Sequence, residues 1–168
     1  MSVTPARGWT GRDTAALLCR ACLAAVFLFS AYMKLVPPGA AQNFAFSIKA
    51  FKVLPDHLVT LFAFVIPWTE LLCAACVLIG AWTRAAALVL VTALGAFTAA
   101  VVRALLNDFD LTCSCFGNQR FICPKGPVTW CKVFENGVIL LPALGTLVLG
   151  SGRAGVDALL ARRGPAAA

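Results

Sequence analysis

The fold is decided by residues 57–106, HLVTLFAFVIPWTELLCAACVLIGAWTRAAALVLVTALGAFTAAVVRALL. They contain two apolar runs, 57–81 and 84–106, and each reaches the roughly 20 residues that a helix needs to cross the hydrocarbon core of a bilayer. The segment from Gly80 to Arg84 is too short for anything but a tight turn. We therefore expect an antiparallel pair of membrane-spanning helices.

Two further apolar stretches, 14–36 and 128–150, flank this hairpin. The 168-residue chain is 61% hydrophobic and only 12% charged, and a soluble domain of this size could not bury that much apolar surface. The sequence therefore predicts an all-α integral membrane protein, a bundle of four transmembrane helices that forms one domain over residues 1–168 with the lipid bilayer around it.

Two of the segments between the predicted spans have recognisable features, a short amphipathic pattern and a cluster of cysteines. From Ala41 to Leu54, phenylalanines alternate with polar residues, which is typical of a short helix lying in the membrane interface. We expect this helix to cover the mouth of the bundle. The segment 107–127 is the only sizeable irregular loop, and it contains Cys113, Cys115 and Cys123, with Cys131 just beyond it.

The positive charge of the chain does not indicate a nucleic-acid partner. The net charge is +7, but the Lys and Arg residues are scattered around the predicted helix ends and form no basic face with interleaved aromatic residues. They divide evenly between the two sides of the membrane, so their count alone does not orient the protein. Disulfides persist in oxidising compartments, which favours a cysteine loop outside and both termini in the cytoplasm.

The chain resembles the MauE branch of the DoxX-like membrane proteins over most of its length. The most specific match is Cys113-Ser114-Cys115-Phe116-Gly117, which is similar to a Cys-Gly-Cys-Phe-Gly signature before the last helix. Weaker matches in the same order are Arg20, Lys34-Leu35, Leu54-Pro55, Pro67-Trp68, Glu70-Leu71, Gly80, Thr83-Arg84 and Thr129-Trp130. The chain departs from the family at Ser114, at Ser30-Ala31 and in its additional pair Cys123 and Cys131.

The resemblance implies a four-helix protein of the bacterial inner membrane that takes part in periplasmic thiol redox chemistry. This includes the maturation of disulfide-containing methylamine dehydrogenase, or electron transfer linked to quinone. It gives the expected location: a multi-pass inner-membrane protein with cytoplasmic termini and a periplasmic cysteine loop.

The loop cysteines are the candidate catalytic residues. A disulfide between Cys113 and Cys115 would close a tight ring, and strained disulfides exchange readily. We expect these two residues to exchange with a periplasmic thioredoxin-like or disulfide-containing partner, with Cys123 and Cys131 as a second pair. Two alternatives stay open: a structural disulfide that staples the loop, and a zinc or iron–sulfur site built from the four thiolates.

A second group of cysteines lies inside the predicted helices. Cys19 and Cys22 form one Cys-x-x-Cys pattern and Cys73 and Cys76 form another, so each pair shares a helix face. Four converging sulfurs would suit copper(I) or zinc. The alternative is that these small side chains simply pack between helices, as small residues do in membranes.

Ionisable residues inside a span are expensive and mark either a functional site or a buried pair. We expect Glu70 to be buried between helices, with Arg20 or a bound polar ligand as its partner. With the neighbouring Trp68 these two residues form a candidate quinone or proton site. We expect Glu135 to meet Lys34 or Lys132.

These observations support three hypotheses from different classes. The first is a membrane thiol–disulfide redox protein that passes electrons to or from quinone near Glu70. The second is a non-catalytic subunit of a larger membrane complex, in which the cysteines act only as staples. The third is a copper-handling or other metal-handling membrane protein.

Overall fold

The computed structural model describes residues 9–52, 54–107, 123 and 129–158. The helices in this part of the chain are α1 (Gly11–Leu35), α2 (Ala40–Ala50), α3 (Asp56–Ile79), α4 (Thr83–Leu106) and α5 (Trp130–Leu149). All except α2 are long and apolar enough to cross a membrane. The predicted class is therefore confirmed, with four candidate spans and a short helix between the first and second of them.

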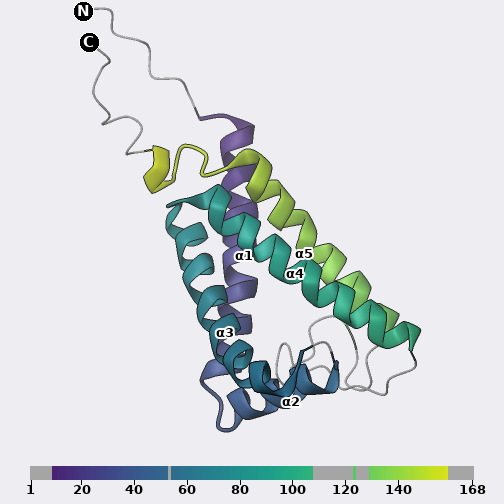
Figure 1. Cartoon of the computed structure of the whole chain (residues 1–168). Helices are drawn as coiled ribbons and strands as arrows, with labels where there is room; N and C mark the ends of the chain where they lie inside the picture. Colours follow the sequence, from purple (N-terminus) through teal and green to yellow (C-terminus); the bar gives the residue numbers. More distant parts are fainter. Residues whose placement is uncertain (1–8, 53, 108–122, 124–128, 159–168) are drawn as a thin grey trace, which may run out of the picture.

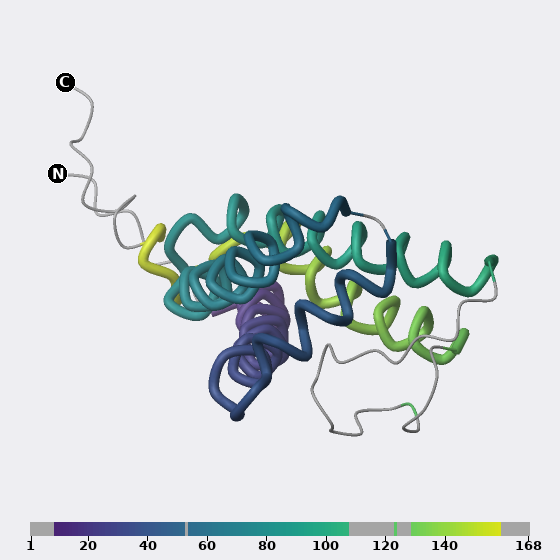
Figure 2. The backbone as a smooth tube through the Cα atoms, turned by 60° about the horizontal axis from the view of Figure 1, so that its bottom comes forward, coloured from purple at the N-terminus to yellow at the C-terminus, as the bar shows by residue number. Residues whose placement is uncertain are grey.

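The spanning helices form a wedge rather than a parallel bundle. Helix α1 packs against α3 and α5, and α4 packs against α5 and α3. Figure 1 shows that α1 and α3 diverge from α4 and α5 toward the end at which α2 lies. Figure 2 brings this end forward and shows α2 crossing it. The bundle therefore has a narrow end, where α1 begins and α5 finishes, and a wide end that α2 partly covers.

Each end of the wedge has its own apolar core. The larger core joins the four spans and consists of Leu23, Ala24, Phe27, Ala74, Val77, Ala86, Ala87, Leu90, Leu94, Ile139 and Ala143. Its many alanines allow the helix backbones to approach closely. At the wide end, Phe51 at the end of α2 packs on Val101 and Ala104 and meets the edge of Phe97, with ring centroids 5.9 Å apart. This contact holds α2 against α4.

The turn between α3 and α4 depends on Gly80. This residue ends α3 with a φ of 75°, in the left-handed region that favours glycine. The N–H groups of Gly80 and Ala81 donate to the carbonyl of Cys76. A Cβ atom on Gly80 would collide with the guanidinium of Arg20 and with the backbone of Gly155. The turn can therefore lie this close to α1 and to the segment after α5 only because residue 80 is a glycine.

Candidate functional site

A cavity of about 390 Å³ lies between the diverging helices at the wide end of the bundle. Its walls are mostly apolar and come from all five helices: Val26, Phe27, Ser30, Lys34, Phe44, Ser47, Ile48, Phe51, Leu54, Phe62, Ile66, Glu70, Ala93, Leu94, Ala96, Phe97, Ala100, Asn136 and Ile139. An apolar cavity with a few polar groups is the usual form of a small-molecule site.

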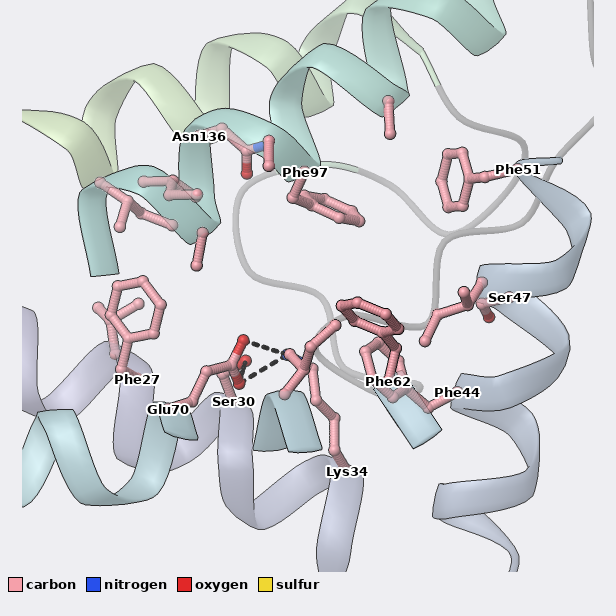
Figure 3. Close-up of a pocket in the computed structure, with 18 of the residues that line it drawn as sticks. Phe27, Ser30, Lys34, Phe44, Ser47, Phe51, Phe62, Glu70, Phe97 and Asn136 are labelled. Carbon is pink, nitrogen blue, oxygen red and sulfur yellow. Dashed lines mark hydrogen bonds and ion pairs between the residues drawn. The ribbon is translucent and has the colours of Figure 1, made fainter. Parts of the chain in front are cut away.

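The polar part of the cavity is a buried ion pair between α1 and α3. The Nζ atom of Lys34 lies 2.7 Å from each carboxylate oxygen of Glu70, and Ser30 donates to the same carboxylate at 3.3 Å. The two charged side chains are only 5% and 9% exposed. Lys34 Nζ also lies 4.9 Å from the centre of the Phe44 ring, a cation–π distance. Figure 3 shows this cluster facing the cavity.

The predicted burial of Glu70 is confirmed, but its partner is Lys34 rather than Arg20. Arg20 and Lys34 are 14 residues apart (34 − 20) on α1, which is about 21 Å along the helix axis. Arg20 lies at the narrow end and does not line the cavity. The expected contact between Arg20 and Glu70 is therefore replaced by an ion pair nearer the wide end.

Trp68 also lies outside the cavity, contrary to its predicted role beside Glu70. Its side chain is 46% exposed and packs near Phe64 on the outer surface of α3, with ring centroids 6.1 Å apart. Residues two positions apart on an α-helix point about 200° away from each other. Because Glu70 faces the bundle interior, Trp68 faces the surroundings.

Arg20 instead holds the narrow end together. Its buried guanidinium donates to the carbonyls of Val77 and Leu78 at the end of α3, at 3.0 and 2.9 Å, and to the carbonyl of Ser151 at 2.6 Å. The last turn of a helix leaves such carbonyls without intrahelical partners. The role of Arg20 in this structure is therefore to join α1, α3 and the segment after α5.

Asp157 completes this narrow-end network. Its carboxylate accepts hydrogen bonds from the backbone N–H groups of Trp82 and Thr83 and from the Thr83 hydroxyl. Partial burial acts to raise the pKa of Asp157, but these hydrogen bonds and the nearby charge of Arg20 outweigh it and hold the pKa below its ordinary value of 3.8. The charged form therefore stabilises the start of α4.

This network makes the stability of the narrow end sensitive to acid. Because the pKa of Asp157 is lower in the folded protein than in the unfolded chain, its contribution is complete above pH 3.8 and is lost as the pH falls through the depressed folded value. We expect Asp157→Asn to lower the melting temperature at pH 7 and to have a smaller effect near pH 2. Thermal unfolding of both proteins in detergent across this range tests the prediction, and a difference that does not depend on pH would contradict it.

Two of the predicted catalytic cysteines are joined in a disulfide. Cys123 and Cys131 are linked with an S–S distance of 1.99 Å and a Cα–Cα distance of 5.9 Å. Cys123 is only 4% exposed, and Cys131 lies in the first turn of α5. The other pair, Cys113 and Cys115, lies outside the described residues. The disulfide therefore attaches one point of the loop region to α5.

The four helix cysteines do not form a common cluster. Cys22 is exposed, whereas Cys19 faces α5, where its sulfur would lie 2.8 Å from a Cβ atom added to Gly145. Cys73 and Cys76 pack beside the larger core. Within the described residues, no three Cys, His, Asp or Glu side chains are grouped so that they could hold a metal ion. The alternative metal site built from these four sulfurs is therefore not assembled.

Glu135 forms an ion pair with Lys132, one of the two partners predicted for it from the sequence. The Nζ atom of Lys132 lies 2.7 Å from Oε2 of Glu135, whose side chain is fully buried. The neighbouring Asn136 donates to Thr98 at 3.0 Å and lines the cavity.

Four polar residues of the cavity were missed from the sequence as site residues: Ser30, Lys34, Ser47 and Asn136. A signal for two of them was available, because Ser30 and Lys34 are four residues apart and therefore share one face of α1. Asn136 stands next to Glu135 within a predicted span, and that neighbourhood of polar residues is itself unusual in a membrane helix.

Comparison with known proteins agrees with this architecture. Residues 12–149 match the family described as methylamine utilisation protein MauE. The chain is 34% identical over 131 residues to the methylamine utilization protein MauE of Paracoccus versutus, and the alignment covers 77% of this chain and 67% of that protein. No solved structure matches. The wider placement among DoxX-like proteins stays a prediction. The matched region contains all four candidate spans almost entirely, and the chain therefore belongs to the MauE family of membrane proteins involved in methylamine utilisation.

Proposed function

We propose that this protein is a membrane thiol–disulfide redox protein. In this proposal Cys113 and Cys115 exchange with a periplasmic thioredoxin-like or disulfide-containing partner, and Cys123 and Cys131 form the second pair. A quinone in the cavity beside Glu70 gives or takes the electrons. Oxidation of two thiols to a disulfide releases two electrons and two protons, which is what a quinone takes up when it becomes a quinol.

The observation that carries the proposal is that the disulfide and the cavity lie at the same end of the bundle. Cys131 lies in the first turn of α5, and Asn136, five residues later, lines the cavity. This separation is about 7.5 Å along the helix axis. The disulfide therefore lies about one and a half helical turns along α5 from a residue that lines the cavity.

The chemistry of the cavity suits a ring with polar substituents and an apolar tail. Phe27, Phe62 and Phe97 offer flat apolar surfaces, and aromatic rings pack well against one another. The Lys34 ammonium can donate a hydrogen bond to a quinone carbonyl, and Glu70 fixes its position. The cavity lies between spanning helices, so a lipid-soluble ligand could reach it from the bilayer.

The proposed orientation follows from the redox role. A cysteine loop that exchanges with a periplasmic partner lies on the periplasmic side of the bacterial inner membrane, which leaves both termini in the cytoplasm. The partner would belong to the methylamine utilisation system in which the family takes part.

Single replacements of the loop cysteines test the proposal. If Cys113 and Cys115 are a working pair, one attacks a sulfur of the partner and the other resolves the mixed disulfide. We expect either Cys113→Ala or Cys115→Ala to trap a covalent complex with the partner, visible on non-reducing electrophoresis when the protein is expressed with its native neighbours.

The same experiment separates this function from a purely structural one. A stapling disulfide would trap no adduct, and its loss would cost about 2–5 kcal/mol of the free energy of unfolding. The subunit reading has one observation in its favour, since the Cys123–Cys131 disulfide does attach the loop region to α5. No adduct from either variant, together with a large loss of stability in Cys123→Ala, which breaks the Cys123–Cys131 disulfide, would decide for the structural subunit.

A further inference from the structure

Glu135 is a buried acid, and only one of its two carboxylate oxygens has a hydrogen-bond partner in the described part of the chain. Its side chain is fully buried, and its Oε2 atom accepts a hydrogen bond from Lys132 at 2.7 Å. The Oε1 atom is inaccessible to solvent and has no hydrogen-bond partner in the described part of the chain. Buried polar atoms are nearly always paired, and exceptions often mark a chemical role. The second oxygen of Glu135 is such an exception.

The position of Glu135 relates it to the disulfide. Cys131 precedes Glu135 by four residues on α5, so the two side chains lie on the same face of the helix. Side chains on an α-helix lean toward its N-terminus. The ion pair with Lys132, three residues earlier, confirms this direction for Glu135. Its carboxyl group therefore lies over the turn that carries Cys131.

We propose that Glu135 is the proton donor and acceptor for the Cys123–Cys131 pair. During reduction, an incoming thiolate attacks Sγ of Cys123 and forms a mixed disulfide, and Sγ of Cys131 leaves as a thiolate. In the proposed disulfide form the proton is on Oε1 of Glu135, the oxygen without a hydrogen-bond partner, while Oε2 accepts from Lys132. This proton passes to the Cys131 sulfur, and Lys132 then balances the charge of the carboxylate that remains. During oxidation, the Cys131 thiol returns its proton to Glu135 as it attacks Sγ of Cys123 and releases the other thiolate.

Among the described residues, the other charged groups near the disulfide are not suited to exchange a proton with it. Of the charged groups at this end on the helices packed against α5, Lys34 on α1 is held by Glu70, and Arg103 on α4 is exposed. The other buried carboxylate at this end, Glu70 on α3, is held by Lys34 and Ser30. The inference rests on the proposed function only in that the pair must cycle between disulfide and dithiol.

The test measures reduction of the Cys123–Cys131 disulfide by dithiothreitol in the full chain, with acid quenching and peptide mapping of the thiols at several pH values. We expect Glu135→Gln to slow this step about 100-fold, which is the lower end of general acid–base effects, and to remove one inflection from the pH profile. Glu135→Asp keeps a carboxyl group and should keep the inflection with a smaller loss. The control is Asp56→Asn, an exposed carboxylate at the same end of the bundle, which should behave as wild type.

Two results would overturn the inference. One is a Glu135→Gln rate within about twofold of wild type. The other is an equal loss in the Gln and Asp variants with an unchanged pH profile, which would indicate a structural role; melting temperatures of both variants show whether they fold. The assay needs neither a protein partner nor a quinone. If Glu135→Gln loses the inflection but neither Cys113→Ala nor Cys115→Ala traps a partner, the proton transfer is supported and the proposed function is rejected. If a partner is trapped but the inflection stays in Glu135→Gln, the proposed function is supported and the proton transfer is rejected.

Discussion

Glu70→Gln is expected to lower the free energy of unfolding by about 3–5 kcal/mol, because it leaves the Lys34 charge buried without a counter-charge. The pair joins α1 and α3 at 2.7 Å, and both side chains are almost inaccessible. The Phe44 ring and the Ser30 hydroxyl can compensate for only part of a full charge. The measurement is unfolding in mixed micelles with increasing denaturing detergent.

A double-mutant cycle separates the ion pair from other effects of the substitution. We expect Lys34→Met combined with Glu70→Met to recover most of the stability, because two apolar side chains leave no buried charge. The matched control is Lys49→Met in the ion pair between Lys49 and Asp56, at 3.2 Å. Its side chains are 59% and 74% exposed, so the loss should stay below about 1 kcal/mol. Equal losses at the two pairs would show that the Lys34–Glu70 pair is not buried.

The fold could be predicted from the sequence because bilayer thickness fixes the length of a spanning helix. The predicted spans 14–36, 57–81, 84–106 and 128–150 differ from the helices by at most three residues at each end. The Lys132–Glu135 pair could also be predicted from the sequence, because residues three positions apart on a helix are neighbours whatever the tertiary structure.

The site was harder to predict because it depends on how helices rotate and tilt. Hydropathy marks a span but says little about which face turns inward, and α3 is apolar around most of its circumference. The two-residue spacing of Trp68 and Glu70 puts them on opposite faces of this helix, so both could not line one cavity. The partner of Glu70 depends on the relative depth of α1 and α3, and this favoured Lys34 over Arg20. The cavity exists because the helix pairs diverge, and no local pattern encodes that angle.

The disulfide shows a third limit. The spacing of Cys113, Cys115, Cys123 and Cys131 allows several pairings, because the sulfur positions in an irregular loop do not follow from sequence separation. The structure joins Cys123 to Cys131 and so connects the loop region to the same helix that contributes Asn136 to the cavity. The redox proposal gains its spatial basis from this connection rather than from the motif.

Filling the cavity is expected to have the largest effect on electron transfer. Ala96 lies on α4 and lines the cavity, and its side chain is not buried in the helix core, so a larger residue can enter the cavity without displacing core side chains. We expect Ala96→Phe to lower the rate of quinone-dependent oxidation of the reduced protein about 100-fold, because small misplacements of a reacting group have effects of this size.

The measurement is anaerobic oxidation of the dithiol form in lipid nanodiscs by a short-chain quinone, with the melting temperature as a check on folding. Ala85→Phe is the matched control: it adds the same side chain to the same helix at an exposed position that does not line the cavity. It should react at the rate of wild type. Reduction of the disulfide by dithiothreitol should be the same in both variants, since that step does not use the cavity. If Ala96→Phe and Ala85→Phe react equally fast with quinone, the ligand binds elsewhere, and the cavity between α1, α3, α4 and α5 is not the site of electron transfer.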